Sequence, residues 1–422
     1  MRLTGMLASF AVGVQLARFL GPEGFGTYGV VVAVALIVGV AAQAGLPAIA
    51  TREIAVALDR KDWGRLRMVL HHLPRRVLGA ALLLAAALGL GAVLWSAGGG
   101  ALDPELWWAP VLIPLFALTA LVGAQLRGLD RPVASQGLET LLRPALMCLL
   151  CLGWLLWSGT FLPAEALALN AASSVVTLAA GCWWLRRAVP DEVRSARAAP
   201  SRVPWSRQGL PLATVDLLKQ VEANYGLLVL GVLAAGAEAG LMRVAMSIVI
   251  FVATPLSVLH TVLAPRFAQL HAAGNRAELQ RLLGWSAAAM TAFTAVATLV
   301  VALAGQPVLT FVFGTGYAGA SLPLLLLTAA FLINASGGCG WVLLAMSGGE
   351  RALSRSYAVA VPVAIALAVV LGQRWGASGV AAAAIVSALV QNFIVWRAVK
   401  RQFGLDSSVL AVLPRRSVAQ AG

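Results

Sequence analysis

Long runs of apolar residues, separated by short polar stretches, make up most of this chain. About 20 apolar residues in a helix are needed to cross the hydrocarbon core of a bilayer. The runs therefore predict twelve membrane-spanning helices, over residues 3–20, 27–50, 74–96, 106–126, 132–157, 163–185, 209–233, 236–263, 283–304, 320–346, 352–372 and 377–399.

The composition agrees with this pattern. Of the 422 residues, 60% are hydrophobic and only 11% are charged, whereas soluble domains carry about 25% charged residues. We expect an all-α integral membrane protein. The four cysteines lie inside apolar runs, and for Cys148 and Cys151 a packing role is favoured over redox or metal chemistry.

The positive charges follow the topology. The net charge is +14, and most Lys and Arg residues fall in the polar segments that share a side with the N-terminus. Since cytoplasmic loops are enriched in Lys and Arg, we predict that both termini are cytoplasmic. The same loops would attract anionic lipid, so the basic balance does not indicate nucleic-acid binding.

The chain divides into two halves that repeat. An Arg- and Pro-rich linker, residues 188–208, separates six-helix lobes at 1–187 and 209–400, and a tail follows at 401–422. Arg52 and Arg266 are 214 positions apart, GPEGFG at 21–26 has a counterpart at 236–240, and RGLDR at 127–131 has one at 347–351. A parallel repeat of this kind is typical of transporters, with a central cavity between the lobes.

Two further features concern local structure. Residues 51–73 and 263–285 are amphipathic and Arg-rich, so we expect helices that lie on the inner surface and do not span. GPEGFG supplies glycine and proline for a tight outer hairpin. It is no phosphate-binding loop, because both of its neighbours are spanning helices.

The sequence blocks resemble a known family. Residues 17–55, 126–146 and 311–360 are similar to blocks of the bacterial polysaccharide-biosynthesis flippases, in the multidrug/oligosaccharidyl-lipid/polysaccharide exporter superfamily. The resemblance implies two lobes around a cavity, in the bacterial cytoplasmic (inner) membrane. It also implies a cargo of polyprenyl-pyrophosphate-linked oligosaccharide, a repeat unit of O-antigen, capsule or exopolysaccharide, moved to the outer leaflet by alternating access. Many relatives have fourteen spans, whereas this chain has twelve.

Charged residues within or beside the spans are candidates for a role in transport, because a charged side chain in lipid is costly and is rare without a function. A pyrophosphate calls for cations, and Arg binds phosphate oxygens bidentately. The candidate substrate-binding residues are Arg18, Arg52, Arg143, Lys219, Arg243 and Arg266. Arg18 could equally be an interfacial anchor.

Three carboxylates are candidates for ion coupling. Asp216, Lys219 and Glu222 form an i, i+3, i+6 ladder with one carboxylate in excess. Glu139 is expected to pair with Arg143 at i, i+4, and Pro144 to kink the helix. H⁺ or Na⁺ would be the coupling ion, and we expect no cofactor or metal.

Two other functions compete with the flippase. A multidrug exporter of the same superfamily would suit a cavity dominated by carboxylates, whereas these candidates mix both signs. A polysaccharide polymerase or ligase would present reactive residues on large outer loops, and the predicted outer loops are short. His260 is expected to be packed and not a proton relay. Partners beyond the glycan lipid, membrane lipid and polysaccharide assembly proteins are not indicated.

Overall fold

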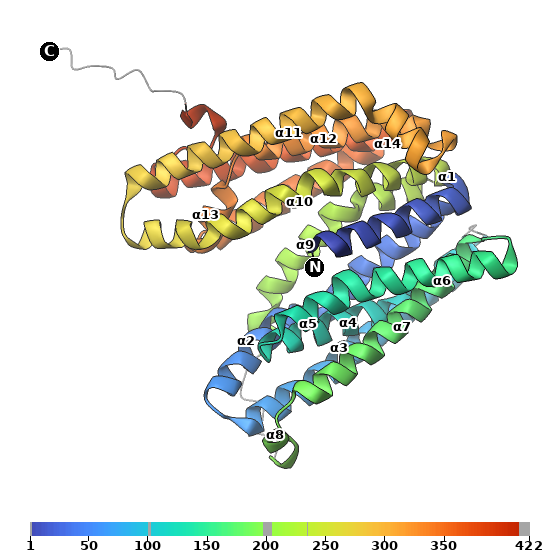
Figure 1. Cartoon of the computed structure of the whole chain (residues 1–422), viewed down its shortest axis with the longest axis horizontal. Coiled ribbons are helices and arrows are strands. Elements are labelled where there is room, and N and C mark those ends of the chain that lie inside the picture. The colour runs from blue at the N-terminus through green and yellow to red at the C-terminus, as the bar shows by residue number, and fades with distance from the viewer. Residues whose placement is uncertain (1, 100–102, 197–204, 234, 413–422) are drawn as a thin grey trace. The chain divides into compact units, whose positions relative to one another are not determined.

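The computed structural model describes residues 2–99, 103–196, 205–233 and 235–412, and these are almost entirely helical (Figure 1). The first half of the chain contains α1 (Arg2–Gln43), α2 (Leu46–Asp59), α3 (Trp63–Ala97), η1 (Pro104–Trp108), α4 (Ala109–Gly128), α5 (Pro132–Gln136), η2 (Gly137–Leu142), α6 (Arg143–Ser158), α7 (Pro163–Ala188) and α8 (Asp191–Ser195). The second contains α9 (Trp205–Val232), α10 (Gly236–Ala272), α11 (Arg276–Phe313), η3 (Thr315–Ala320), α12 (Ser321–Ser336), α13 (Gly340–Met346), α14 (Glu350–Phe403) and η4 (Val409–Val412).

The spans agree with the apolar runs. Within the described residues, 9 helical segments are long and apolar enough to cross a membrane. Two of them are broken by a glycine in a non-helical conformation, Gly21 in α1 and Gly376 in α14, so each makes two spans. With α9 added, the twelve predicted spans are all present, and this is a multi-pass membrane protein. The break at Gly21 is the hairpin predicted for GPEGFG (Figure 1).

By its contacts the chain forms two compact units, Met1–Gly231 and Val232–Gly422. The helix α9 therefore belongs with the first unit, although the sequence expected it to open the second lobe. It packs tightly against α1, since a Cβ on Gly231 would lie 2.6 Å from the side-chain atom Cγ1 of Val30. The lobe boundaries expected from the repeat stay a prediction.

Neither expected surface segment forms a single helix, and their position on the inner surface stays a prediction. Residues 51–73 contain the end of α2, a tight turn and the start of α3, and residues 263–285 contain the end of α10, a turn and the start of α11. Each is a helical hairpin. The arms α3, α10 and α11 continue into candidate spans, whereas α2 is a separate helix of 14 residues that begins after a turn at Ala44 and Gly45. The 37 residues of α10 reach about 55 Å, well beyond the ~30 Å core. An arm that emerges from the membrane is amphipathic for the same reason as a surface helix, because one face packs and the other is wet.

The two hairpins have the same backbone. In the first, Arg65 N–H donates to the N-cap Asp62 at 3.0 Å, and Lys61 has a φ of 54°. In the second, Glu278 N–H donates to the N-cap Asn275 at 3.1 Å, and Gly274 has a φ of 67°. The backbone hydrogen bonds of the turns also correspond one by one. The internal repeat is thus confirmed.

In the structure, the number of positions between equivalent residues of the repeat differs slightly from the number expected from the sequence. Asp59 and Ala272 end the first arms and are 213 positions apart, one fewer than the sequence comparison suggested. Likewise the turn after α4, with Asp130 at positive φ, corresponds to the turn after α13, with Gly348 at positive φ. That offset is 218, not 220. The outer hairpins keep 214, since Pro22 follows the break in α1 and Gly236 begins α10.

The segment that follows α14 is held against α11 and α14 by hydrogen bonds of Asp406. Asp406 accepts hydrogen bonds from Trp396 Nε1 at 3.0 Å and from Ser408 N at 3.0 Å. Gln280 of α11 exchanges two hydrogen bonds with the Asp406 backbone, at 2.7 and 2.8 Å. The adjacent apolar core includes Phe267, Leu279 and other buried side chains of α10 to α14.

Candidate functional site

A π-helical turn separates the two charges that were expected to pair. Residues Gly137–Leu142 form η2, a π-helix, and α6 begins at Arg143 with Pro144 in its first turn. A π-turn holds more residues than an α-turn, so Glu139 and Arg143 no longer lie one above the other. The disturbance predicted at Pro144 is therefore this π-turn. Between these two described residues no ion pair forms, and the predicted Glu139–Arg143 pair is wrong.

Glu139 instead faces α4. Its Oε1 lies 3.6 Å from Nη1 of Arg127, and Arg127 also donates to the Ser135 hydroxyl at 2.8 Å. A Cβ on Gly123 would clash with the Glu139 carboxylate, so α4 must present glycine here. The charge of Glu139 is thus partly balanced from α4.

Arg143 faces α1, α4 and α7. Its Nη2 donates to Asn170 Oδ1 at 2.9 Å, and Asn170 Nδ2 donates to the Tyr28 hydroxyl at 2.6 Å. The guanidinium carbon lies 4.1 Å from the centre of the Phe116 ring, a cation–π contact. Among the residues that the structure describes, no carboxylate pairs with Arg143. We call Tyr28, Phe116, Arg143 and Asn170 the Arg143 network.

Three of these four residues, Tyr28, Phe116 and Asn170, were not predicted from the sequence. Asn170 belongs to a stripe on α7 with Ser173, Ser174 and Thr177, all at most 3% exposed. Their i, i+3, i+4, i+7 spacing places them on one helix face. This polar stripe inside an apolar span was the available signal. Its hydroxyls mostly return to backbone carbonyls of α7, which leaves the Asn170 amide to hold Arg143.

The second unit has apolar residues where the first has this network. The outer-hairpin offset matches Tyr28 with Met242. Pro163 and Ala377 are each the first residue of equivalent spans. Aligning the two spans at these residues matches Asn170 with Ala384. The turn after α4 matches Arg143 with Val361, or with Ala360 if the π-turn is treated as an insertion. Met242, Ala360 and Val361 are at most 4% exposed. The repeated fold thus packs without these polar groups.

The other candidates of the first unit lie apart from this network. Arg18 is exposed three residues before the break at Gly21. Arg52 is exposed and lies 3.4 Å from Glu53, a buried carboxylate that also pairs with Arg65. On α9, Asp216 and Lys219 are exposed and Glu222 is half-buried. The roles proposed for these residues stay predictions.

In the second unit, Arg243 is half-buried on α10. Because it follows the outer hairpin while Arg18 precedes its own, the two arginines lie on opposite arms of equivalent hairpins. Arg266 pairs with Glu278 at 3.5 Å, and both side chains are about half exposed. His260 packs edge-on against Trp341 with ring centres 5.0 Å apart, as expected of a packed histidine.

The reactive side chains of the described residues form no further site. All four cysteines are free thiols, Cys151 and Cys339 buried and the other two half-buried. Within the part of the chain that the structure describes, His, Cys, Asp and Glu form no group of three able to hold a metal.

The sequence of the first unit and of the start of the second matches a family. The model of the family described as "Polysaccharide biosynthesis protein" matches residues 1–271. The chain belongs to this family. No curated protein is significantly similar to it in sequence.

Solved structures show the fold of this polysaccharide biosynthesis protein. An inward-facing multidrug resistance MATE family transporter of the MOP superfamily has a TM-score of 0.73 and 17% identity, covering 94% of this chain and 95% of its own. The outward-facing form of a MATE family transporter has a TM-score of 0.61 and 17% identity, over 95% and 94% of the two chains. A MOP superfamily transporter from Pyrococcus furiosus, described as having a binding pocket of reverse polarity, has a TM-score of 0.61 and 16% identity, over 95% of both chains. The chain thus has the fold of these MOP superfamily transporters.

Proposed function

We propose that this transporter is a flippase for polyprenyl-pyrophosphate-linked oligosaccharide. It would move the lipid-linked repeat unit of a surface polysaccharide from the inner to the outer leaflet of the bacterial cytoplasmic membrane, by alternating access and with both termini cytoplasmic. The family match supports the glycan pathway, and the transporter fold favours translocation over polymerase or ligase chemistry.

One observation carries the proposal: the guanidinium of Arg143 is held within a span by neutral groups alone. Asn170 and the Phe116 ring orient it without neutralising it. A cation in a medium of low dielectric constant favours an anionic partner strongly, and the planar fork of Arg fits two phosphate oxygens at once. We assign this residue to binding of the pyrophosphate.

The remaining cations would guide the anion along its path. Arg52 and Arg266 would attract it at the inner mouth, Lys219 would hold it at mid-depth, and Arg18 and Arg243 would receive it near the outer rim. The polyprenyl tail stays in lipid, so only the head group needs these contacts. Asp216, Glu222 and Glu139 would couple transport to H⁺ or Na⁺, with the excess carboxylate of the α9 ladder as the first choice.

The alternative is a multidrug exporter, as in the matching MATE structures. Cationic drugs need carboxylates that lack a cationic partner. In the Arg143 network the charged group is a cation, and the neighbouring Glu139 is already paired with Arg127. This arrangement favours an anionic cargo.

The test uses a bacterial strain that lacks its own copy of this protein, with surface polysaccharide as the measurement. Arg143→Ala should abolish most export, and Arg143→Lys should restore only part of it, because an ammonium cannot bind bidentately. Arg355→Ala removes an exposed arginine of α14 and serves as the matched control. Membrane levels of every variant are measured alongside.

Lipid-linked oligosaccharide should accumulate in the Arg143→Ala strain, while sensitivity to cationic drugs stays unchanged. Full export by Arg143→Ala at normal protein levels would overturn the assignment of this residue. Altered drug sensitivity with normal polysaccharide would favour the multidrug exporter.

A further inference from the structure

The segments that follow α7 and α14 are held by one and the same position of the two hairpins. Arg67 of α3 and Gln280 of α11 each lie five residues after the N-cap residue of their helix, so they are equivalent. The Arg67 side chain bonds residues 189–196, which follow α7, and the Gln280 side chain bonds residues 404–412, which follow α14. We call these the first and the second exit segment.

The first exit segment lies on the surface of its unit. Nη1 of Arg67 donates to the backbone carbonyls of Arg194 at 2.7 Å and of Ala196 at 2.6 Å, at the C-terminal end of α8. Basic side chains commonly satisfy the last carbonyls of a helix in this way. Val193 is the one buried side chain among residues 189–196. One guanidinium and one apolar side chain thus fasten this segment to α3.

The second exit segment is built into its unit. Gln280 donates to the Asp406 carbonyl at 2.7 Å and accepts from the Asp406 N–H at 2.8 Å, and Trp396 donates to the Asp406 side chain. Ser407 is fully buried. A Cβ on Gly338 would lie 2.7 Å from the Ser407 carbonyl oxygen, so the turn before α13 needs glycine to seat this segment.

The first unit lacks such a seat. The turns after α4 and α13 match Gly338 with Ala120, and Gly340 with Val122. A Cβ on Gly340 would lie 2.8 Å from Oγ of Ser407, whereas both equivalent positions of the first unit carry a Cβ. The helix α4 also passes through them without a break. The first exit segment therefore cannot be seated as the second is.

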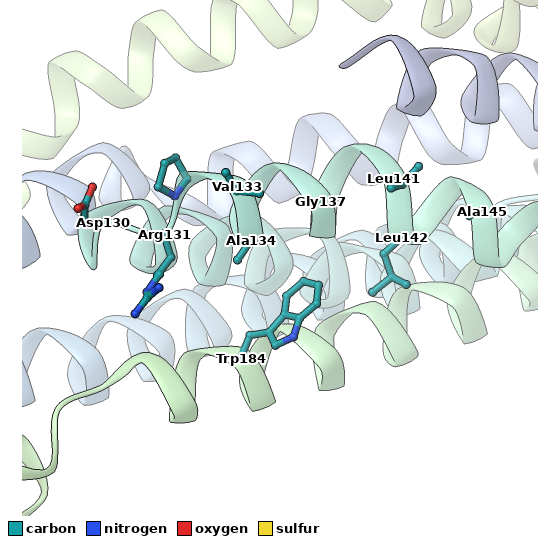
Figure 2. Close-up of a pocket in the computed structure, with 10 residues that line it drawn as sticks. Asp130, Arg131, Val133, Ala134, Gly137, Leu141, Leu142, Ala145 and Trp184 are labelled. Atoms are coloured by element: carbon teal, nitrogen blue, oxygen red, sulfur yellow. The ribbon is translucent and has the colours of Figure 1, made fainter. Parts of the chain in front are cut away.

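The end of α7 that carries the first exit segment is itself loosely packed. Trp184, Leu185 and Ala188 are only partly buried where they pack against a small apolar core. Figure 2 shows Trp184 reaching from α7 towards the helix that carries Ala134 and Leu142. Trp184 also lines a groove with a volume of about 690 Å³. The open space beside α7 gives its end room to shift.

We propose that the first exit segment is a releasable latch, which ties the end of α7 to α3 and opens during the transport cycle, while the second is a permanent fastening. Water can replace the surface hydrogen bonds of Arg67 at small net cost, whereas release of the second segment would unpack Ser407. Because α7 also carries Asn170, which holds Arg143, the latch controls how far α7 moves at the proposed pyrophosphate site. The proposal rests on the proposed transport function.

The first test is hydrogen–deuterium exchange of the purified full chain, which needs no cargo. In the wild type the Ala196 amide, bonded to Glu192, should exchange at least about tenfold faster than the Asp406 amide, bonded to Gln280. Local opening costs less free energy where fewer buried groups hold a segment.

The same measurement on variants isolates Arg67. Arg67→Ala should speed exchange in residues 189–196 about tenfold, the effect of losing one hydrogen bond to a charged group. Arg67→Lys should restore part of the protection, because an ammonium also donates to carbonyls. Arg75→Ala, at an exposed arginine of the same helix, is the matched control and should leave exchange unchanged. Size-exclusion profiles and melting temperatures show that each variant is folded.

The second test measures surface polysaccharide in the strain that lacks its own copy of the protein. Arg67→Ala should lower export about tenfold, in proportion to the loss of the closed latch, and Arg67→Lys should restore export in parallel with protection. Arg143→Ala is assayed beside them, and Arg75→Ala again serves as the control.

Faster exchange and lower export in Arg67→Ala, both partly restored by Arg67→Lys, support the latch. Equal exchange of the two exit segments in the wild type, or unchanged exchange in Arg67→Ala, overturns it. Full export by Arg67→Ala where Arg143→Ala has lost export overturns the latch alone. Full export by both variants overturns the flippase assignment and, with it, the role of the latch in transport.

Discussion

The two units use one backbone plan with different interiors. In the first unit, α1, α6 and α7 meet around Tyr28, Arg143 and Asn170, whereas the equivalent positions of the second unit hold methionine, alanine and valine. Because the second unit packs well without polar groups there, the Arg143 network is not a requirement of the fold. A cation within a span is costly, and this one is present in only one of the two units.

The hairpins at the ends of α2 and α10 differ in a second way. Both use an Asp or Asn N-cap and the same hydrogen bonds. The ion pair that bridges the arms is reversed, with Glu53 and Arg65 in the first unit and Arg266 and Glu278 in the second. Turn chemistry thus determines the backbone, while the bridging pair tolerates either polarity.

The largest expected effect comes from giving the first unit the interior of the second. We expect the triple variant Tyr28→Met, Arg143→Val, Asn170→Ala to fold, with a free energy of unfolding within about 2 kcal/mol of wild type, because no partner is left unpaired. Arg143→Val alone should be less stable, since Asn170 then loses its donor. Surface polysaccharide should fall to background in the triple variant. Normal export would show that the network is structural.

Next in size is the removal of one carboxylate from each hairpin. Glu53 is 5% exposed, so Glu53→Ala leaves Arg65 without its buried partner and should cost about 3 kcal/mol. Glu278→Ala, at an exposed pair, should cost less than about 1 kcal/mol. Thermal unfolding in detergent measures both. Equal costs would mean that burial does not distinguish the two pairs.

A smaller effect is expected at the start of α7 and at the start of its equivalent, the part of α14 that follows Gly376. In the second unit Glu238 accepts the Ala377 N–H at 2.7 Å, while the first unit has Gly24 beside Pro163, which has no N–H. Glu238→Gly should cost about 1 kcal/mol, as for the loss of an N-cap. Adding Ala377→Pro should recover much of this, because the unpaired donor is then gone. A thermal-shift double-mutant cycle tests it, and additive losses would contradict the equivalence.

The smallest effect concerns the turn residues. Lys61 has a φ of 54° and its equivalent Gly274 a φ of 67°. Since glycine adopts positive φ without strain, Lys61→Gly should stabilise by about 0.5–1 kcal/mol and Gly274→Lys should destabilise by a similar amount. Melting temperatures of the two variants give the signs, and a loss of stability in Lys61→Gly would contradict the assigned turn.

The sequence predicted the spans and the repeat because both rest on periodic apolar runs and on glycine-rich turns. It did not predict the helical hairpins, since an amphipathic pattern is the same for a surface helix and for an arm that leaves the membrane. The spacing of Glu139 and Arg143 predicted a pair only for an α-helix, and η2 adds residues to that turn. Asn170 and Tyr28 carry no charge, so a search for charges in spans passes over them.

The reversed polarity of the two bridging pairs bears on how a duplicated protein avoids joining the wrong halves as it is made. If the arm of α2 met that of α11, Glu53 would lie against Glu278, and if the arm of α10 met that of α3, Arg266 would lie against Arg65. Like charges held together destabilise a contact, so each exchanged pairing is penalised while each correct one is favoured. The opposite polarities of the two ion pairs thus favour the correct pairing of helical arms over an exchange of arms between the two hairpins during assembly.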